Sequence, residues 1–397
     1  MFASYLRYPK LTCFERMQRC LFLSSIPFAR RKVHLQHQPV ENSNHLEMDP
    51  IHILGIGSMG KLCAYSLASN HNPPPLTLLL HRPILYDMMK ANPPKIKIHH
   101  DGAWHEQGPY AVELISETGH QNDSKTKDIS NLIVTTKTHN TVEALSMIKH
   151  RLTPTSTVLF IQNGMGVMED VNTFVFPNAQ DRPHYLSAIA SHGVHTKTSL
   201  TAVLAGHGSI IIGNPDIKSS VPNYLLQQVV ESKLLQASEV SWDEFKLLQL
   251  QKLAVNAVIN PLTALNDCLN GKILEYSMSG DPGRLFEGLL SEISQVLCSL
   301  PELRKTPGLK ERFSTTSLRN NVLNIACATR ENKSSMLQDI SNGRETEIRS
   351  INGYIVKRAQ ELGIECSMNK RIVTDILTAV TKPKLRKVYD EDSLTAR

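Results

Sequence analysis

The chain has 397 residues, of which 41% are hydrophobic and 20% charged, and its formal net charge is +6. This composition is typical of a folded globular protein of about two domains, and it excludes disordered, collagen-like and fibrous proteins. Seven scattered cysteines without a C-x-x-C pair predict neither a disulfide framework nor a structural zinc site.

The net charge is concentrated at the N-terminus. Residues 1–40 contain seven basic side chains and one acidic one, so the rest of the chain is neutral overall. An arginine-rich, acid-poor segment interspersed with apolar residues is typical of a mitochondrial transit peptide. We therefore expect residues 1–47 to be a mitochondrial (matrix) targeting segment and linker, whereas translation from Met48 would give a cytoplasmic protein. The neutral remainder argues against nucleic acid as a partner, and no run of about 18 apolar residues predicts a membrane helix.

A short apolar strand is predicted over residues 51–54, and a glycine-rich loop leads from it into a helix. The loop has the pattern G-x-G-x-x-G, which binds a dinucleotide when a strand precedes it and a helix follows. The first glycine permits a tight turn, the second lets the pyrophosphate approach, and the third lets helix and strand pack closely. We expect the cofactor to contact this loop: Gly55, Ile56, Gly57, Ser58, Met59 and Gly60.

A second strand is predicted over residues 76–80 and is followed by His81 and Arg82. A site specific for NAD would have a carboxylate here to bind the ribose 2′-hydroxyl. An arginine favours a 2′-phosphate instead, because its guanidinium pairs with phosphate through two parallel hydrogen bonds. The sequence thus predicts NADP(H) as cofactor, although a solvated surface arginine is the alternative reading.

Two further strands, over residues 132–136 and 158–162, are each followed by a polar residue, Lys137 and Asn163. In open parallel sheets, ligands bind beyond the carboxyl ends of the strands. We expect both side chains to lie near the nicotinamide end of the cofactor.

From Trp242 the apolar spacing becomes helical, and residues 244–260 are apolar almost all round. Lys252, Asn256 and Asn260 recur at intervals of four and so lie on one helix face. Burying these groups is costly without partners. They could be satisfied by a neighbouring helix or by water, or they could line a cavity for a small polar acid. Pro261 should then break or kink the helix.

A polar cluster over residues 334–347 precedes another helix, predicted from Ile351 to a stop at Gly363. Glu347 is expected in the first turn of that helix, where the helix dipole alone favours an acidic residue. A functional role for Glu347 therefore depends on finding a partner for it.

Together these segments resemble the ketopantoate reductase (2-dehydropantoate 2-reductase) family, over about residues 50–375. The segments that carry the resemblance stand in one order along the chain: 55–60, 135–137, 162–166, 191–194, 206–208, 252–264, 270–271, 335–339, 347 and 351–353. The most specific of them is the segment from Lys252 to Ala264.

The resemblance implies an α/β chain with a Rossmann-type NADP-binding domain, an all-helical domain and an active site between them. It implies hydride transfer from NADPH to 2-dehydropantoate, giving (R)-pantoate for pantothenate and coenzyme A synthesis. The family's general acid falls on Lys252 and its partner carboxylate on Glu347, which is also a cofactor contact. The other family positions fall on Asn163 at the nicotinamide, Lys137 and Arg82 at the phosphates, Val194 as a main-chain cofactor contact, and Asn256, Asn260, Asn270 and Ser335 at the substrate.

The chemistry agrees with these positions. Hydride addition to a ketone leaves an alkoxide, which a cationic lysine can stabilise and protonate, and no metal is needed. We predict domains over residues 48–241 (Rossmann) and 242–380 (helical), and a charged tail over 381–397, in a monomer or homodimer. The alternatives are a reductase of another 2-keto acid and a non-catalytic mitochondrial binding protein with the same fold. The intact glycine loop and Lys252 argue against the second.

Overall fold

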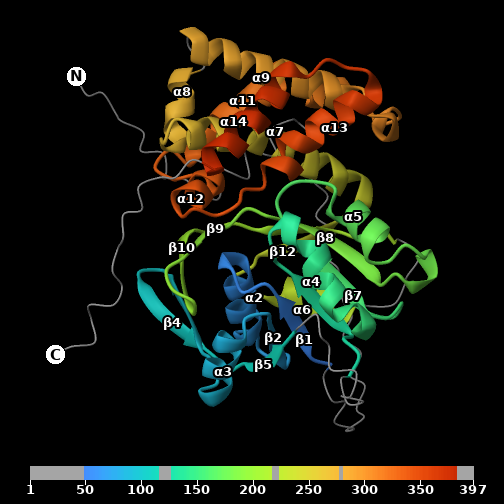
Figure 1. The fold of residues 1–397 in the computed structure, drawn as a ribbon, viewed down its shortest axis with the longest axis vertical. Helices are drawn as coiled ribbons and strands as arrows, with labels where there is room; N and C mark the ends of the chain where they lie inside the picture. The colour runs from blue at the N-terminus through green and yellow to red at the C-terminus, as the bar shows by residue number, and fades with distance from the viewer. Residues whose placement is uncertain (1–48, 116–126, 217–222, 277–279, 382–397) are drawn as a thin grey trace, which may run out of the picture. The chain divides into compact units, whose positions relative to one another are not determined.

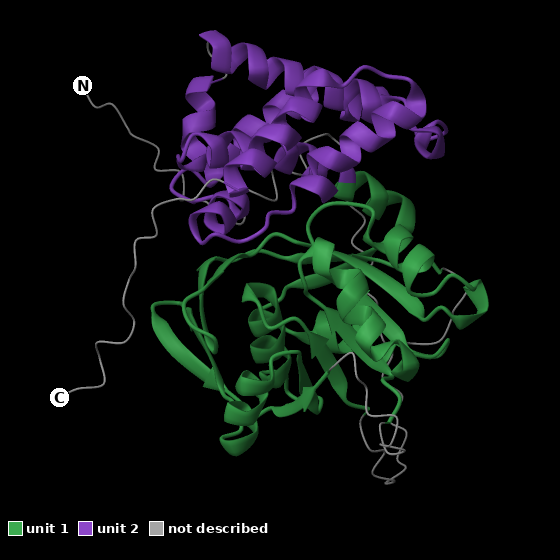
Figure 2. Ribbon diagram, viewed as in Figure 1, with its two compact units in different colours: residues 1–249 green, residues 250–397 purple. Residues whose placement is uncertain are grey.

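The computed structural model describes residues 49–115, 127–216, 223–276 and 280–381. The chain divides into two compact units, residues 1–249 and residues 250–397, which Figure 2 colours separately. The predicted targeting segment, residues 1–47, lies outside the described residues, and so does the predicted tail beyond Thr381.

The first unit is built around a mostly parallel, eight-stranded sheet (Figure 1). Its strand order is β12-β11-β8-β7-β6-β1-β2-β5; the strands from β8 to β5 are parallel to one another, and β11 is antiparallel to β8. The strands are β1 (Ile51–Leu54), β2 (Leu76–Leu80), β5 (Ala111–Leu114), β6 (Asn131–Val134), β7 (Thr157–Phe160), β8 (His184–Ala190), β11 (Ile210–Gly213) and β12 (Ala237–Val240).

Helices cover both faces of this sheet, which explains why every residue of its central strands is buried, rather than every second one. On one face, Ile53 and Ile133 pack with residues of α2 (Ser58–Ala68) and α6 (Tyr224–Glu231). On the other face, Leu54 and Val134 pack with residues of α4 (Thr141–Ile148) and α5 (Val167–Phe174). Another helix of this unit, α3 (Pro83–Ala91), follows β2.

A second, four-stranded sheet lies against α2 on the side away from the main sheet (Figure 1). Its order is β4-β3-β10-β9, with β3 parallel to β10 and the two outer pairs antiparallel. The strands are β3 (Ile96–His100), β4 (Ala103–Gln107), β9 (Gly193–Thr196) and β10 (Thr201–Gly206). Helix α2 is therefore enclosed between two sheets.

The predicted strands over residues 51–54 and 76–80 are found at those residues. The predictions over 132–136 and 158–162 are displaced, because β6 ends at Val134 and β7 at Phe160. Thr135 still donates its backbone N–H to Leu54, but its side chain turns to the carbonyl oxygen of Gly55. The strand thus ends in a contact with the glycine loop.

The second unit consists, in its described residues, of helices only. Helix α7 (Trp242–Leu265) begins in the first unit, and the residues from Leu250 onward belong to the second. The other helices are α8 (Ile273–Tyr276), α9 (Gly280–Cys298), α10 (Leu309–Arg312), α11 (Thr315–Ala328), α12 (Ser335–Ser341), α13 (Asn352–Leu362) and α14 (Ser367–Thr381). This arrangement confirms the predicted α/β class with a helical C-terminal region. Within the described part of the chain, no helix is long and apolar enough to cross a bilayer.

Candidate functional site

The glycine loop has the geometry that its pattern predicts. Gly55 has φ +98°, and a Cβ there would lie 2.7 Å from the backbone nitrogen of Thr136. A Cβ at Gly60 would clash with the carbonyl oxygen of Gly55. A Cβ at Gly57, by contrast, would meet no atom within 4 Å. The loop is therefore tight beneath the first and third glycines and open above the second, where a pyrophosphate needs room.

The side chains between the glycines divide into two kinds. Ile56 and Met59 are partly buried and pack on the core of the first unit, so they leave their backbone groups for a ligand. The hydroxyl of Ser58 lies 3.0 Å from that of Thr196 on β9. This contact brings the strand of Val194 to the loop, at the N-terminal end of α2.

The predicted residues of the two neighbouring strand ends also lie together. Lys137 precedes a short 3-10 turn (Thr138–Asn140), and the hydroxyl of Thr138 donates to the backbone oxygen of Asn163, 2.9 Å away. Because β1, β6 and β7 are adjacent and parallel, Lys137, Asn163 and the glycine loop share one edge of the sheet. Both side chains are partly exposed there.

Arg82 lies at the carboxyl end of β2, next to β1, and is the residue before α3. Its side chain is exposed. The position is the one that a 2′-phosphate contact requires, but this contact stays a prediction.

Lys61, which follows the third glycine, was not predicted as part of the site. Its side chain is 1% exposed, and Nζ donates to Thr196 Oγ1 (3.1 Å) and to the backbone oxygen of Thr198 (2.7 Å). Burial lowers its pKa to about 8. The available signal was a charged residue in the first turn of the helix, directly before the apolar run Leu62, Cys63 and Ala64.

In the second unit, the polar face of α7 is the exception in a buried helix. Between Leu247 and Ala264 the residues that are not fully buried are Gln249, Lys252 and Asn256; Asn260 is 6% exposed. The lysine and the first asparagine thus share an accessible face one turn apart, as the four-residue spacing predicts.

Lys252 and Glu347 act on each other electrostatically. Burial lowers the pKa of Lys252 to about 8, and the negative charge of Glu347 opposes that shift. Glu347 is 6% exposed. Glu347 was expected in the first turn of α13, but it lies before a separate 3-10 turn (Ile348–Ser350). The dipole of α13 therefore does not explain this carboxylate, and Lys252 is an electrostatic partner for it; the catalytic role of Glu347 stays a prediction.

Pro261 was predicted to break or kink α7, and the break is absent. The helix continues to Leu265, although Pro261 cannot donate the backbone hydrogen bond that the carbonyl of Ala257 would receive. The side chain of Asn352 donates to that carbonyl instead, at 2.8 Å. A partner from another helix therefore lets α7 run on past its proline.

The last two predicted substrate residues lie at the ends of short elements. Asn270 begins a 3-10 turn (Asn270–Lys272) and donates its side-chain amide to Thr329, while its buried Oδ1 has no hydrogen-bond partner among the described residues. Ser335 is exposed at the start of α12. The preceding Ser334 caps α12 and accepts a hydrogen bond from Thr263 at the end of α7, which ties Ser335 to the polar helix.

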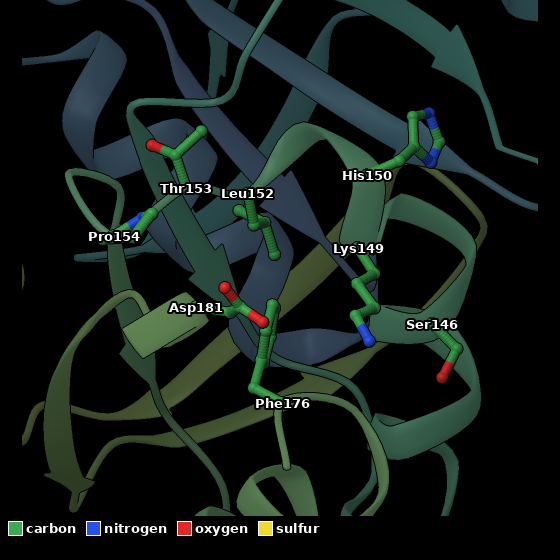
Figure 3. Close-up of a pocket in the computed structure, with 8 residues that line it drawn as sticks. All are labelled: Ser146, Lys149, His150, Leu152, Thr153, Pro154, Phe176 and Asp181. Carbon is green, nitrogen blue, oxygen red and sulfur yellow. The ribbon is translucent and has the colours of Figure 1, made fainter. Parts of the chain in front are cut away.

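A surface hollow of about 490 Å³ lies elsewhere (Figure 3). Its lining residues come from the segments before β7 and after α5: Ser146, Lys149, His150, Leu152, Thr153, Pro154, Phe176 and Asp181. The hollow is at the amino end of β7, so it lies at the opposite sheet edge from Asn163 and the glycine loop. Among the residues that the structure describes, no group of three His, Cys, Asp or Glu side chains is placed to hold a metal ion.

A parallel sheet with a dinucleotide loop, followed by a helical unit with a lysine–carboxylate pair, defines a nicotinamide-dependent oxidoreductase. The chain belongs to the ketopantoate reductase family. The family descriptions "Ketopantoate reductase PanE/ApbA" and "Ketopantoate reductase PanE/ApbA C terminal" match residues 51–216 and 244–380. The protein is therefore an oxidoreductase acting on CH–OH groups.

Fungal relatives cover most of the chain. A probable 2-dehydropantoate 2-reductase of Schizosaccharomyces pombe is 30% identical over 81% of this chain and 94% of its own length. The 2-dehydropantoate 2-reductase of Saccharomyces cerevisiae is 30% identical over 81% of this chain and 92% of its own. The ketoisovalerate reductase BEA2 of Gibberella fujikuroi is also 30% identical, over 79% of each chain.

Solved structures share the fold. A probable 2-dehydropantoate 2-reductase of Bacillus subtilis superposes with a TM-score of 0.58 at 24% identity, over 83% of this chain and 99% of that one. D-mandelate dehydrogenase with NADH and anilino(oxo)acetate has a TM-score of 0.66 at 20% identity, over 83% and 98% of the two chains. At these identities the likeness concerns the fold alone.

Proposed function

We propose that the protein catalyses the NADPH-dependent reduction of 2-dehydropantoate to (R)-pantoate, a step toward pantothenate and coenzyme A. The observation that carries the proposal is the Lys252–Glu347 pair next to the amide stripe of α7. The two fungal relatives named 2-dehydropantoate 2-reductase, each matched over more than nine-tenths of its own length, support it.

The first unit suits a dinucleotide. The open face of Gly57 is a cradle that a Cβ would fill, and the N-terminal N–H groups of α2 favour an anion there. We assign Lys137, Asn163 and the backbone of Val194 to the cofactor, and Arg82 to the 2′-phosphate. When bound, the cofactor supplies the hydride.

The second unit provides the proton and the grip on the substrate. Lys252 holds a proton on Nζ, and its pKa of about 8 allows it to release that proton to an alkoxide near neutral pH. Glu347 keeps the ammonium form populated. Asn256, Asn260, Asn270 and Ser335 bind the hydroxyl and carboxylate of the substrate, and the unpaired Oδ1 of Asn270 is an acceptor for a hydroxyl.

Ketoisovalerate is the second candidate substrate, because the BEA2 relative that bears its name is as similar as the pantoate enzymes. Ketoisovalerate lacks the hydroxymethyl group of 2-dehydropantoate. A site that hydrogen-bonds a substrate hydroxyl rejects an analogue without it, since a buried polar group would be left unpaired. The Oδ1 of Asn270, which has no hydrogen-bond partner among the described residues, therefore favours 2-dehydropantoate.

Replacing the lysine tests the mechanism. Lys252→Ala should lower kcat about 100-fold or more, the order expected for loss of a general acid. Lys246→Ala is the matched control on the same helix, because Lys246 pairs with Asp243 at the surface and should leave kcat unchanged. Near wild-type turnover by Lys252→Ala, measured by NADPH oxidation, would exclude the role given to this lysine.

A further inference from the structure

The hydrogen bond from Asn352 to the carbonyl of Ala257 links α7 to the segment that contains Glu347. The proposed reaction needs residues of both segments. We propose that Asn352 is a positioning residue, which holds the segment of Glu347 in register with the helix face of Lys252. This inference rests on the proposed function for its kinetic consequence, and on the hydrogen bonds of the second unit for its geometry.

The hydrogen bond that Asn352 makes is needed because of a proline in α7. Pro261 leaves the carbonyl of Ala257 without its i+4 donor, and Ala257 is fully buried, so water cannot supply one. Nδ2 of Asn352 donates to that oxygen at 2.8 Å. Ala257 directly follows Asn256 in α7, so its carbonyl lies on the buried side of the helix, about 100° round the axis from Asn256.

The same Nδ2 group makes a second hydrogen bond, while Oδ1 of Asn352 has no hydrogen-bond partner among the described residues. Nδ2 also donates to Oδ1 of Asn369 at 3.0 Å, and both asparagines are fully buried. Asn369 in turn donates its side-chain amide to Glu292 of α9, whose carboxylate also accepts the backbone N–H groups of Met368 and Asn369. A buried, connected network of this kind allows few alternative geometries.

The connection from Asn352 back to Glu347 is short and hydrogen-bonded. The backbone N–H groups of Ser350 and Ile351 both donate to the carbonyl oxygen of Glu347, at 3.1 Å each. The six residues from Glu347 to Asn352 therefore form a compact turn that ends on α7 at Ala257. A shift of Asn352 along α7 would shift Glu347 relative to Lys252.

A compensating pair of substitutions separates positioning from stability. Asn352→Leu keeps the volume and removes the donor, so Tm should fall by several degrees and kcat by about tenfold or more. Adding Pro261→Ala restores a backbone N–H at position 261 that can donate to the carbonyl of Ala257, so Tm should recover in part. The kcat should stay low in the double variant, because the link between the two segments is still absent.

A readout without substrate is the pH dependence of Lys252 modification by an amine-reactive reagent, followed by mass spectrometry. In Asn352→Leu and in the double variant, the pKa of Lys252 should fall below its wild-type value, because Glu347 no longer raises it as strongly. Asn266→Leu is the control, since Asn266 also donates to a carbonyl of α7, that of Leu262, but is exposed.

A double variant that regains wild-type kcat, Tm and Lys252 pKa would overturn the proposal and leave Asn352 a purely stabilising role. The double variant carries the same readouts if the single variant does not fold. Absence of turnover in the wild-type protein with any 2-keto acid would instead contradict the proposed function, while the labelling result would still decide the role of Asn352.

Discussion

Lys61 and Lys252 are two lysines whose pKa burial lowers to about 8, but their surroundings differ. Glu347 opposes the shift at Lys252, whereas burial is the sole cause of the shift at Lys61, whose bonds go to Thr196 and Thr198. A buried ammonium with neutral partners is costly. Lys61 therefore reduces stability in exchange for tying the β9–β10 turn to the glycine loop.

This cost has a defined pH dependence. Folding lowers the pKa of Lys61 from 10.5 to about 8, so between these values the unfolded chain binds the proton more tightly and stability rises with pH. Lys61→Met should thus raise Tm at pH 7, and the gain should shrink toward pH 10 and vanish or reverse as the lost hydrogen bonds dominate. Thermal unfolding across this range measures the effect.

Lys97→Met is the matched control, because Lys97 lies on β3 of the small sheet that packs against α2, but it is exposed and pairs with Glu106. Its Tm difference from wild type should not show this decline. A pH-independent Tm difference for Lys61→Met would contradict the burial of a charged group at this position.

The sequence predicted the residues proposed to take part in the reaction better than the residues proposed to position them. Lys252 and Asn256 follow from a four-residue spacing, which is a local pattern. The partner of Lys252 could be placed only through resemblance, because Glu347 is 95 positions away in the chain. Asn352 lies in a segment that carries the family resemblance, but its contact with α7 could not be predicted, since the carbonyl that it satisfies lacks a donor because of a proline in another helix.

Among the elements, the glycine loop gives the clearest contrast between folding and binding. Gly57→Ala places a methyl group in open space, and the residue has φ −78°, which alanine adopts readily. Its Tm should be unchanged, but cofactor binding should weaken because the methyl fills the pyrophosphate position. Gly60→Ala should instead lower Tm, because its Cβ would clash with Gly55. Thermal unfolding and cofactor fluorescence titration separate the two.

A stable Gly57→Ala protein that binds the cofactor with wild-type Kd would show that the pyrophosphate does not approach at this glycine. Unchanged Tm in Gly60→Ala would show that helix α2 does not pack on the loop as closely as described.

Element prediction succeeded where one local period dominated and failed where distant contacts decided. The strands over residues 51–54 and 76–80 are short runs that are apolar apart from His52 and Thr77, and both are found as predicted. The end of β6 depends on a contact between Thr135 and Gly55. The continuation of α7 past Pro261 depends on Asn352. The four-stranded sheet was not anticipated, because β3 pairs with β10 about a hundred residues later.

At the scale of the whole molecule, membership of the family identifies the type of reaction more closely than it identifies the substrate. Relatives of equal identity bear the names of 2-dehydropantoate and ketoisovalerate reductases. The substrate thus depends on a few polar groups, such as Oδ1 of Asn270, and the choice of cofactor depends on Arg82.

The most direct measurement is a comparison of kcat/KM for the purified protein with 2-dehydropantoate and ketoisovalerate, each with NADPH and with NADH. We predict that 2-dehydropantoate with NADPH is preferred by at least about 100-fold over ketoisovalerate, since the lost hydroxyl leaves a polar group unpaired. Arg82 should make NADPH the better cofactor. Efficient turnover of ketoisovalerate without turnover of 2-dehydropantoate would contradict the proposed substrate, and equal use of both cofactors would contradict the 2′-phosphate site.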